Sequence, residues 1–189
     1  MKQAKVLSEQ EFKRVVAIIQ QGRHSARNRI ALMLSHYAGL RVGEIAQLQW
    51  GDVINSNGDV ADRINLRAET TKGGLARSVF VNEKLAREIE RYRASLDRSG
   101  VQVRPLLRTQ KHTAFSANTL CQLFSQLYRL AGVDGASSHS GRRWFITQLA
   151  HSGISPKVIM TLAGHRHLTT TQRYIDVNDE MLKSAVSVL

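Results

Sequence analysis

Helix-length segments with clear start and stop signals recur along this chain, and they constrain its fold more than any other feature. Ser8 is a candidate N-cap with Glu11 three residues on, as a capping box requires, and Gly22 marks the end of that segment. Asn82 and Ser116 are further candidate N-caps before apolar stripes of helical period. Helices are therefore predicted between Ser8 and Gly22, over about residues 25–38, 40–48, 83–96, 117–131, 139–151 and 155–163, around Tyr174, and over 181–189.

The pattern changes between Trp50 and Asn82, where short β-like runs replace the helical period. Three strands are expected, over residues 52–54, 64–66 and 78–81, with a turn at 55–58. Residues 69–74 form the second hairpin, which places Lys72 at its tip as either an exposed loop residue or a functional group. Because no repeat or linker interrupts the chain, we expect one domain over residues 1–189, of the α+β class, mainly helical with a small three-stranded antiparallel sheet.

The charge of the chain points to a polyanionic partner. Its 189 residues include 27 Lys and Arg against 15 Asp and Glu, a net charge of +12. Such an excess favours nucleic acid as a partner over a basic surface that binds nothing. The single cysteine, Cys121, excludes a disulfide framework or a cysteine-built zinc site within one chain. No apolar run reaches about 18 residues and no signal peptide is visible, so a cytoplasmic protein is expected.

Four residues between positions 139 and 174 could touch one phosphate. His139 and Arg142 are three apart on a predicted helix and share a face, while His165 and Tyr174 follow in the next segments. A guanidinium binds phosphate oxygens bidentately, and a phenol can attack phosphorus. Each residue alone also has an ordinary structural interpretation.

A second candidate anion site lies at Arg41. It starts a helix, where the positive end of the dipole disfavours a cation unless an anion binds there; the alternative is a solvated arginine.

Together, these residues resemble the signature of the tyrosine recombinases, the phage-integrase family. The first arginine motif of that family matches Gly39-Leu40-Arg41-Val42-Gly43-Glu44-Ile45-Ala46-Gln47-Leu48, and its hairpin lysine matches Lys72. Its H-x-x-R box matches His139-Ser140-Gly141-Arg142, and its L-G-H box matches Leu162-Ala163-Gly164-His165, with Tyr174 nine residues later. The resemblance covers residues from about Leu7 to Val177. The sequence differs from the family pattern at two positions: Ala163 stands inside what is often a Leu-Gly-His run, and Gly141 stands where leucine is common. It implies the tyrosine-recombinase catalytic-domain fold.

The resemblance also implies a reaction. Tyr174 is expected to attack DNA phosphorus and form a 3′-phosphotyrosyl link, with Arg41 and Arg142 on the non-bridging oxygens and His165 hydrogen-bonded to the phosphate. His139 is the expected base, Lys72 the acid that protonates the departing 5′-oxygen, and Glu44 an orienting residue. No metal, ATP or other cofactor is expected, since Glu44 lacks an acidic neighbour to share an ion and no phosphate-binding Gly-rich loop is present.

The expected partner is double-stranded DNA, bound by a homotetramer that is monomeric when free. The C-terminal segment 181–189 is expected either to dock on a neighbouring protomer or to fold back in cis. The family's N-terminal clamp domain is expected to be absent, because a catalytic-domain helix already begins at Ser8. This suggests an excised domain or a natural minimal member. Two other functions stay open, a type IB topoisomerase and a DNA-binding accessory protein that does not cut.

Overall fold

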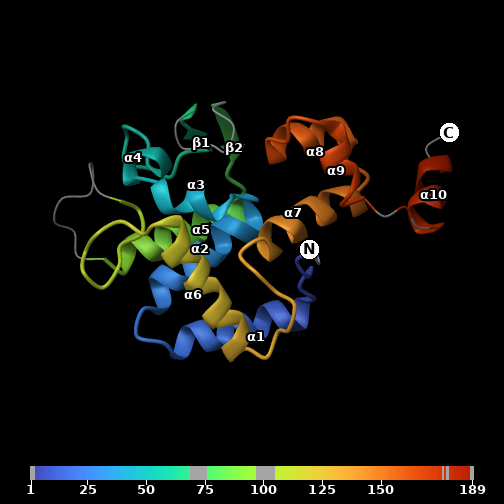
Figure 1. The fold of residues 1–189 in the computed structure, drawn as a ribbon. Helices are drawn as coiled ribbons and strands as arrows, with labels where there is room; N and C mark the ends of the chain where they lie inside the picture. Colours follow the sequence, from blue (N-terminus) through green and yellow to red (C-terminus); the bar gives the residue numbers. More distant parts are fainter. Residues whose placement is uncertain (1–2, 69–75, 97–104, 176, 178, 188–189) are drawn as a thin grey trace.

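The computed structural model describes residues 3–68, 76–96, 105–175, 177 and 179–187 of the chain (Figure 1). In chain order its elements are α1 (Glu9–Gln21), α2 (Ser25–Tyr37), α3 (Val42–Gln47), α4 (Trp50–Val53), β1 (Arg63–Leu66), β2 (Arg77–Phe80), α5 (Glu83–Ala94), α6 (Ala117–Leu130), α7 (Ser140–His151), α8 (Pro156–Ala163), α9 (Leu168–Gln172) and α10 (Asp179–Val186). The mainly helical α+β class is confirmed.

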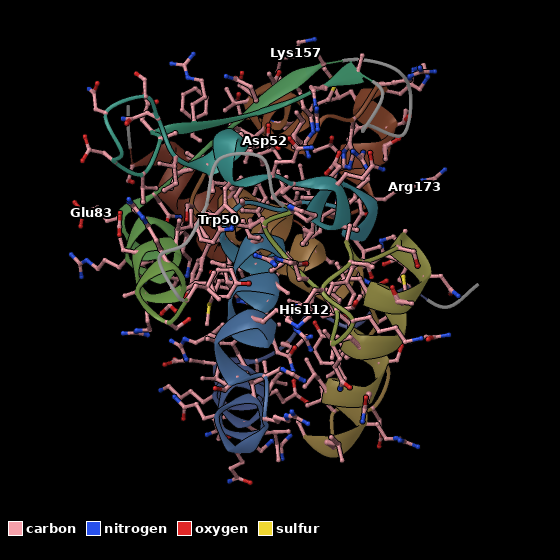
Figure 2. The ribbon with its side chains drawn as sticks, turned by 90° about the vertical axis from the view of Figure 1, so that its left-hand side faces the viewer. Trp50, Asp52, Glu83, His112, Lys157 and Arg173 are labelled. Carbon is pink, nitrogen blue, oxygen red and sulfur yellow. The ribbon has the colours of Figure 1, made fainter. Side chains whose placement is uncertain are left out.

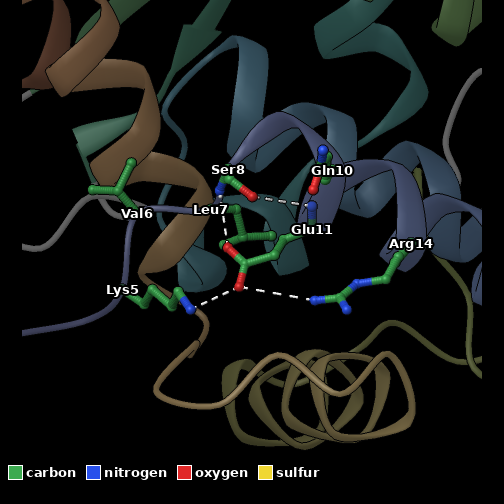
Figure 3. A pocket seen from close by; sticks show the side chains of 7 residues that line it. All are labelled: Lys5, Val6, Leu7, Ser8, Gln10, Glu11 and Arg14. Atoms are coloured by element: carbon green, nitrogen blue, oxygen red, sulfur yellow. Dashed lines mark hydrogen bonds and ion pairs between the residues drawn. The ribbon is translucent and has the colours of Figure 1, made fainter.

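The long helices begin at the cap residues expected from the sequence. Ser8 and Glu11 form a reciprocal capping box, in which each backbone N–H donates to the other side chain at 3.0 and 3.2 Å. Glu11 also pairs with Lys5 at 2.7 Å, which fastens the entering chain to α1 (Figure 3). Asn82 and Ser116 accept from the backbone N–H three residues on, at 2.9 and 3.1 Å. These local bonds explain why the predicted helix starts agree with the structure.

The sheet has two strands among the described residues, so the expected third strand at 52–54 is wrong. β1 and β2 pair antiparallel, with Ile64 opposite Val79. Residues 50–53 instead form the short helix α4, because Asp52 accepts the Gln49 backbone N–H at 2.8 Å and closes the first turn. Helical spacing also buries Trp50 and Val53 together, and Trp50 lies inside the molecule while Asp52 caps the turn (Figure 2).

The main core surrounds α2, which is buried along most of its length. Its apolar residues are enclosed by α1, α3, α5 and α7. The helices α2 and α7 pack especially closely. A Cβ on Gly141 of α7 would lie 2.5 Å from the Oγ of Ser35 in α2 and 3.0 Å from the Ser35 carbonyl carbon. The departure from leucine at Gly141 therefore has a packing reason: α7 rests directly on the backbone of α2.

A second, smaller core holds the C-terminal motifs together. It contains Ile146 and Ala150 of α7 with Ile159 and Ala163 of α8, and Tyr174 packs against it. Figure 1 shows α7, α8 and α9 grouped together, with α10 beyond them at the edge. α10 leaves Leu182 and Val186 exposed. No helix in the described part of the chain is long and apolar enough to cross a membrane.

Candidate active site

The site is built around a buried carboxylate at the start of α3. Gly39 takes a left-handed conformation, φ 60°, that turns the chain into this helix. Glu44 lies almost fully buried and accepts the Arg41 backbone N–H at 2.7 Å and Arg41 Nη1 at 2.9 Å. The Glu44 carboxylate, from the same helix, therefore compensates part of the Arg41 charge at the helix start. The Arg41 side chain is half-buried, so it is not the solvated arginine that was the alternative.

Three arginines converge on the C-terminal end of α8. Arg77 Nη1 donates to the Leu162 carbonyl at 2.9 Å, Arg142 Nη2 donates to the next carbonyl, Ala163, and Arg41 Nη2 donates to Gly164 at 3.1 Å. The last carbonyls of a helix lack intrahelical partners and carry the negative end of its dipole. Three consecutive carbonyls therefore hold three guanidinium groups from β2, α7 and the start of α3 in one place.

Arg77 was missed by the sequence analysis. Its side chain is 10% exposed, and Nη2 pairs with Glu44 Oε2 at 2.8 Å, while Arg41 occupies Oε1. One signal was available: Arg77 stands opposite the buried Leu66 in the sheet and has the same phase as the buried Val79. An arginine on the core-facing side of a strand needs a buried anion or carbonyl partner.

The electrostatics of the cluster favour an anion. Burial opposes ionisation of Glu44, but Arg77, the Arg41 N–H and the Arg41 charge together lower the pKa of its carboxyl. Burial, followed by the charges of Arg41 and Arg77, lowers the pKa of Arg142 to about 9. Arg142 therefore stays cationic at neutral pH. One carboxylate among three guanidinium groups leaves a positive excess that a phosphate would relieve.

Arg142 joins this cluster to the first motif of the chain. Its side chain is buried, and Nη1 donates to the Gly39 carbonyl at 2.6 Å, across 103 positions of sequence. The same guanidinium reaches Ala163 through Nη2. Gly39, Arg142 and the end of α8 are thereby locked together, which places the two predicted phosphate-binding arginines, Arg41 and Arg142, side by side.

His165 and Tyr174 lie together next to the arginines. The His165 ring bonds to Thr171 Oγ1 at 2.8 Å through Nδ1 and stacks on the Tyr174 ring, with centroids 5.8 Å apart. Burial, then the charges of Arg142, Arg41 and Arg77, lowers the pKa of His165 to about 4, so it is neutral at pH 7. Arg143 places its guanidinium 5.9 Å from the Tyr174 ring centroid and donates to the Ala4 carbonyl at 2.6 Å.

The environment of Tyr174 differs from the sequence prediction in one respect. The helix predicted around Tyr174 ends before that residue: α9 spans Leu168–Gln172, and its N-cap is His167. Tyr174 follows that helix in a turn, where its N–H donates to the Thr171 carbonyl at 2.9 Å. Thr171, which is buried, therefore binds the His165 ring through Oγ1 and the Tyr174 backbone N–H through its carbonyl oxygen.

The two remaining predicted site residues are His139 and Lys72. His139 is the N-cap of α7, exposed, with its backbone N–H donating to Ser137 Oγ at 3.3 Å. It lies three positions, about one helical turn, before Arg142. Lys72 falls outside the described residues. Within residues 3–68, 76–96, 105–175, 177 and 179–187, no group of three or more His, Cys, Asp or Glu side chains is arranged to hold a metal.

Comparisons with known proteins identify the family to which the chain is similar. Residues 5–181 match the model of the phage integrase family. The tyrosine recombinase XerA of Thermococcus kodakarensis is 31% identical over 181 residues, covering 96% of this chain and 61% of the relative. XerD of Neisseria meningitidis is 29% identical over 185 residues, covering 96% and 61%. The chain thus spans about 60% of the length of each of these two relatives.

Solved structures share the fold. A crystal structure of XerA recombinase has a TM-score of 0.74 at 25% identity, covering 99% of this chain and 64% of that one. XerH site-specific recombinase bound to its difH substrate has a TM-score of 0.68 at 23% identity, covering 99% and 55%.

Proposed function

Because this chain belongs to the phage integrase family, we propose that it is the catalytic domain of a site-specific DNA recombinase. The observation that carries the proposal is the convergence of Arg41, Arg142, His165 and Tyr174 at the end of α8. Residues from three separate motifs provide two guanidinium groups, a neutral imidazole and a phenol at one place. These are the groups required for phosphoryl transfer to a tyrosine.

In the proposed reaction, the Tyr174 oxygen attacks a DNA phosphorus and the bond to the 5′-oxygen breaks. This leaves a 3′-phosphotyrosyl link and a free 5′-hydroxyl. Attack by a 5′-hydroxyl, from the same or a second DNA, reverses the step and releases the tyrosine. One phosphodiester is exchanged for another, so no nucleotide cofactor is consumed.

Each residue has one task in this step. Arg41 and Arg142 stabilise the charge on the non-bridging oxygens, and removing one such donor typically costs about 3–4 kcal/mol of barrier. His165, neutral at pH 7 because of its lowered pKa, hydrogen-bonds the phosphate. His139 takes the phenol proton, Lys72 protonates the departing 5′-oxygen, and Glu44 orients Arg41. The proposed step uses no metal ion.

The proposed partners are double-stranded DNA and further copies of the chain. The net charge of +12 supports DNA binding, and the relative XerH was solved bound to its difH DNA. We propose a homotetramer on DNA and a monomer in its absence. The exposed Leu182 and Val186 of α10 are the surface through which one protomer would hold the next. Residues 1–189 are proposed to act as one domain.

A suicide DNA substrate, nicked so that the cleaved end diffuses away, tests the proposal. The wild-type chain should accumulate a covalent DNA adduct, whereas Tyr174→Phe should bind DNA with similar affinity and form none. An adduct in Tyr174→Phe would contradict the assignment of the nucleophile. No adduct from the wild type would indicate a DNA-binding accessory protein. Relaxation of a supercoiled plasmid lacking a recombination site would favour a topoisomerase.

A sulfur-substituted substrate separates the general acid from the arginines. Lys72→Ala should cleave ordinary DNA slowly, since general acid help is typically worth about 10²–10⁴-fold. It should approach the wild-type rate when the 5′-bridging oxygen is sulfur, because a thiolate leaves without protonation. Arg142→Ala should stay slow on both substrates, as it acts on the non-bridging oxygens. Rescue of Arg142→Ala instead would reverse the two assignments.

A further inference from the structure

We infer that Arg77 is a positioning residue of the active site, which fixes the Glu44–Arg41 pair against the turn that carries His165. The inference rests on the proposed function. Arg77 contacts both halves of the site at once: Nη2 pairs with Glu44 at 2.8 Å, and Nη1 donates to the Leu162 carbonyl at 2.9 Å. These partners lie 33 and 85 positions away along the chain. Arg77 is therefore a direct bridge between α3 and α8.

The fit between Arg77 and the end of α8 is close. A Cβ on Gly164 would overlap Cδ of Arg77 and lie 2.7 Å from its Nε. Gly164, at φ 63° and ψ 46°, also supplies the left-handed cap from which His165 follows. The arginine side chain thus lies directly on the turn that aims His165, and a shift of one must move the other.

The shape of the guanidinium explains why arginine occupies this position. The two terminal nitrogens donate in fixed directions to acceptors on two different elements, whereas a lysine ammonium is a single point charge on a flexible stem. Lysine could pair with Glu44 or reach the Leu162 carbonyl, but it would not hold both in one geometry. A lysine variant should therefore retain part of the effect.

Arg77 also controls the charge of Glu44. The charged groups facing that carboxylate are Arg41 at the start of its own helix, Arg77 from β2 and Arg142 from α7, and His165 lies beside the same arginines. Its two ion pairs in the described structure are with Arg41 and Arg77. Burial raises the pKa of Glu44, and the Arg77 charge opposes this effect. Loss of Arg77 would therefore raise the pKa of the Glu44 carboxyl. A protonated Glu44 no longer fixes the Arg41 guanidinium.

The test compares the pH profile of covalent adduct formation in Arg77→Met, Arg77→Lys and Arg63→Met, at saturating protein on the suicide substrate. Arg63 is the matched control, an exposed arginine on the paired strand whose guanidinium lies 4.9 Å from the Phe80 ring centroid. Arg77→Met should slow cleavage about 100-fold, as misplacement of catalytic groups by about 1 Å does. Its acid limb should shift to higher pH, and Arg77→Lys should be intermediate. Arg63→Met should keep the wild-type profile.

A merely structural role would lower the melting temperature of Arg77→Met without shifting the pH profile of its folded fraction, and that result would overturn the inference. The shift should vanish when Glu44→Gln is added, because no carboxylate is left to titrate; a shift that persisted would also overturn it. If Arg77→Met does not fold, Arg77→Lys decides: a wild-type rate and profile would refute the inference. Absence of any adduct from the wild type would refute the proposed function itself.

Discussion

Replacing Gly164 with alanine should destabilise the protein more than the same replacement at Gly153. Both glycines follow a helix in the left-handed region, with φ 63° at Gly164 and φ 74° at Gly153. An added Cβ meets nothing within 4 Å at Gly153, whereas at Gly164 it overlaps the Arg77 side chain. The pair therefore separates the cost of the backbone conformation from the cost of displacing Arg77.

The magnitudes follow from these contacts. A residue with a Cβ loses about 1–2 kcal/mol in the left-handed region. Restriction of the unfolded chain by alanine offsets this by about 0.4–1 kcal/mol. Gly153→Ala should therefore cost about 1 kcal/mol. At Gly164, Arg77 must also move off Glu44. Breaking a buried pair completely costs about 3–5 kcal/mol, and because Arg41 still pairs with Glu44 we expect about 2–4 kcal/mol of this cost. We expect about 3–5 kcal/mol in total for Gly164→Ala.

Urea denaturation followed by circular dichroism measures the free energy of unfolding of both variants, and thermal denaturation gives their melting temperatures. A difference of about 2–4 kcal/mol between them should lower the melting temperature of Gly164→Ala by roughly 5–15 °C relative to Gly153→Ala. Cleavage of the suicide substrate should fall in Gly164→Ala, since Arg77 and His165 are both displaced, and stay near wild type in Gly153→Ala. Equal stability and equal cleavage in the two variants would refute the argument that Arg77 occupies this space.

Three further predictions concern stability and DNA binding. His36, stacked between Phe12 and Trp144 at 4.1 and 3.7 Å, has its pKa lowered by burial to about 3. Between about pH 6.5 and pH 3 the unfolded state therefore binds the proton and the folded state does not, so stability should fall by about 1.4 kcal/mol per pH unit as the pH drops. His36→Phe should reduce the slope by this amount in urea titrations between about pH 4.5 and 6.5, while His165, whose pKa burial also lowers, keeps its own contribution; an unchanged slope would assign it to other groups. Gly141→Ala should cost about 1–3 kcal/mol, because its Cβ would press against the α2 backbone at Ser35, and a neutral result would mean that α7 moves freely. If about six phosphates are neutralised, log K for DNA should fall with log salt at a slope near −5, and a slope shallower than about −2 would exclude the basic surface as the DNA face.

The sequence by itself determined most helix starts and the residues of the motifs. Ser8, Asn82 and Ser116 were identified as caps because a cap bonds a backbone N–H only two or three residues away. The end of α1 at Gly22 could be predicted for the same reason, because a helix end also depends on residues close by in the sequence. The family motifs likewise depend on residue identity and spacing, which need no coordinates.

Tertiary structure decided what surrounds these residues. Residues 52–54 looked like a strand, yet burial of Trp50 and Val53 against the same core selected the helix α4. Tyr174 was expected within a helix, but it follows α9, where Thr171 fixes both it and His165.

Arg77 had no motif to reveal it. Its partners, Glu44 and the Leu162 carbonyl, come within reach only when β2, α3 and α8 pack together. A cap depends on neighbours along the chain, whereas the acceptors of a buried arginine depend on which distant segments meet, and only the folded chain determines that.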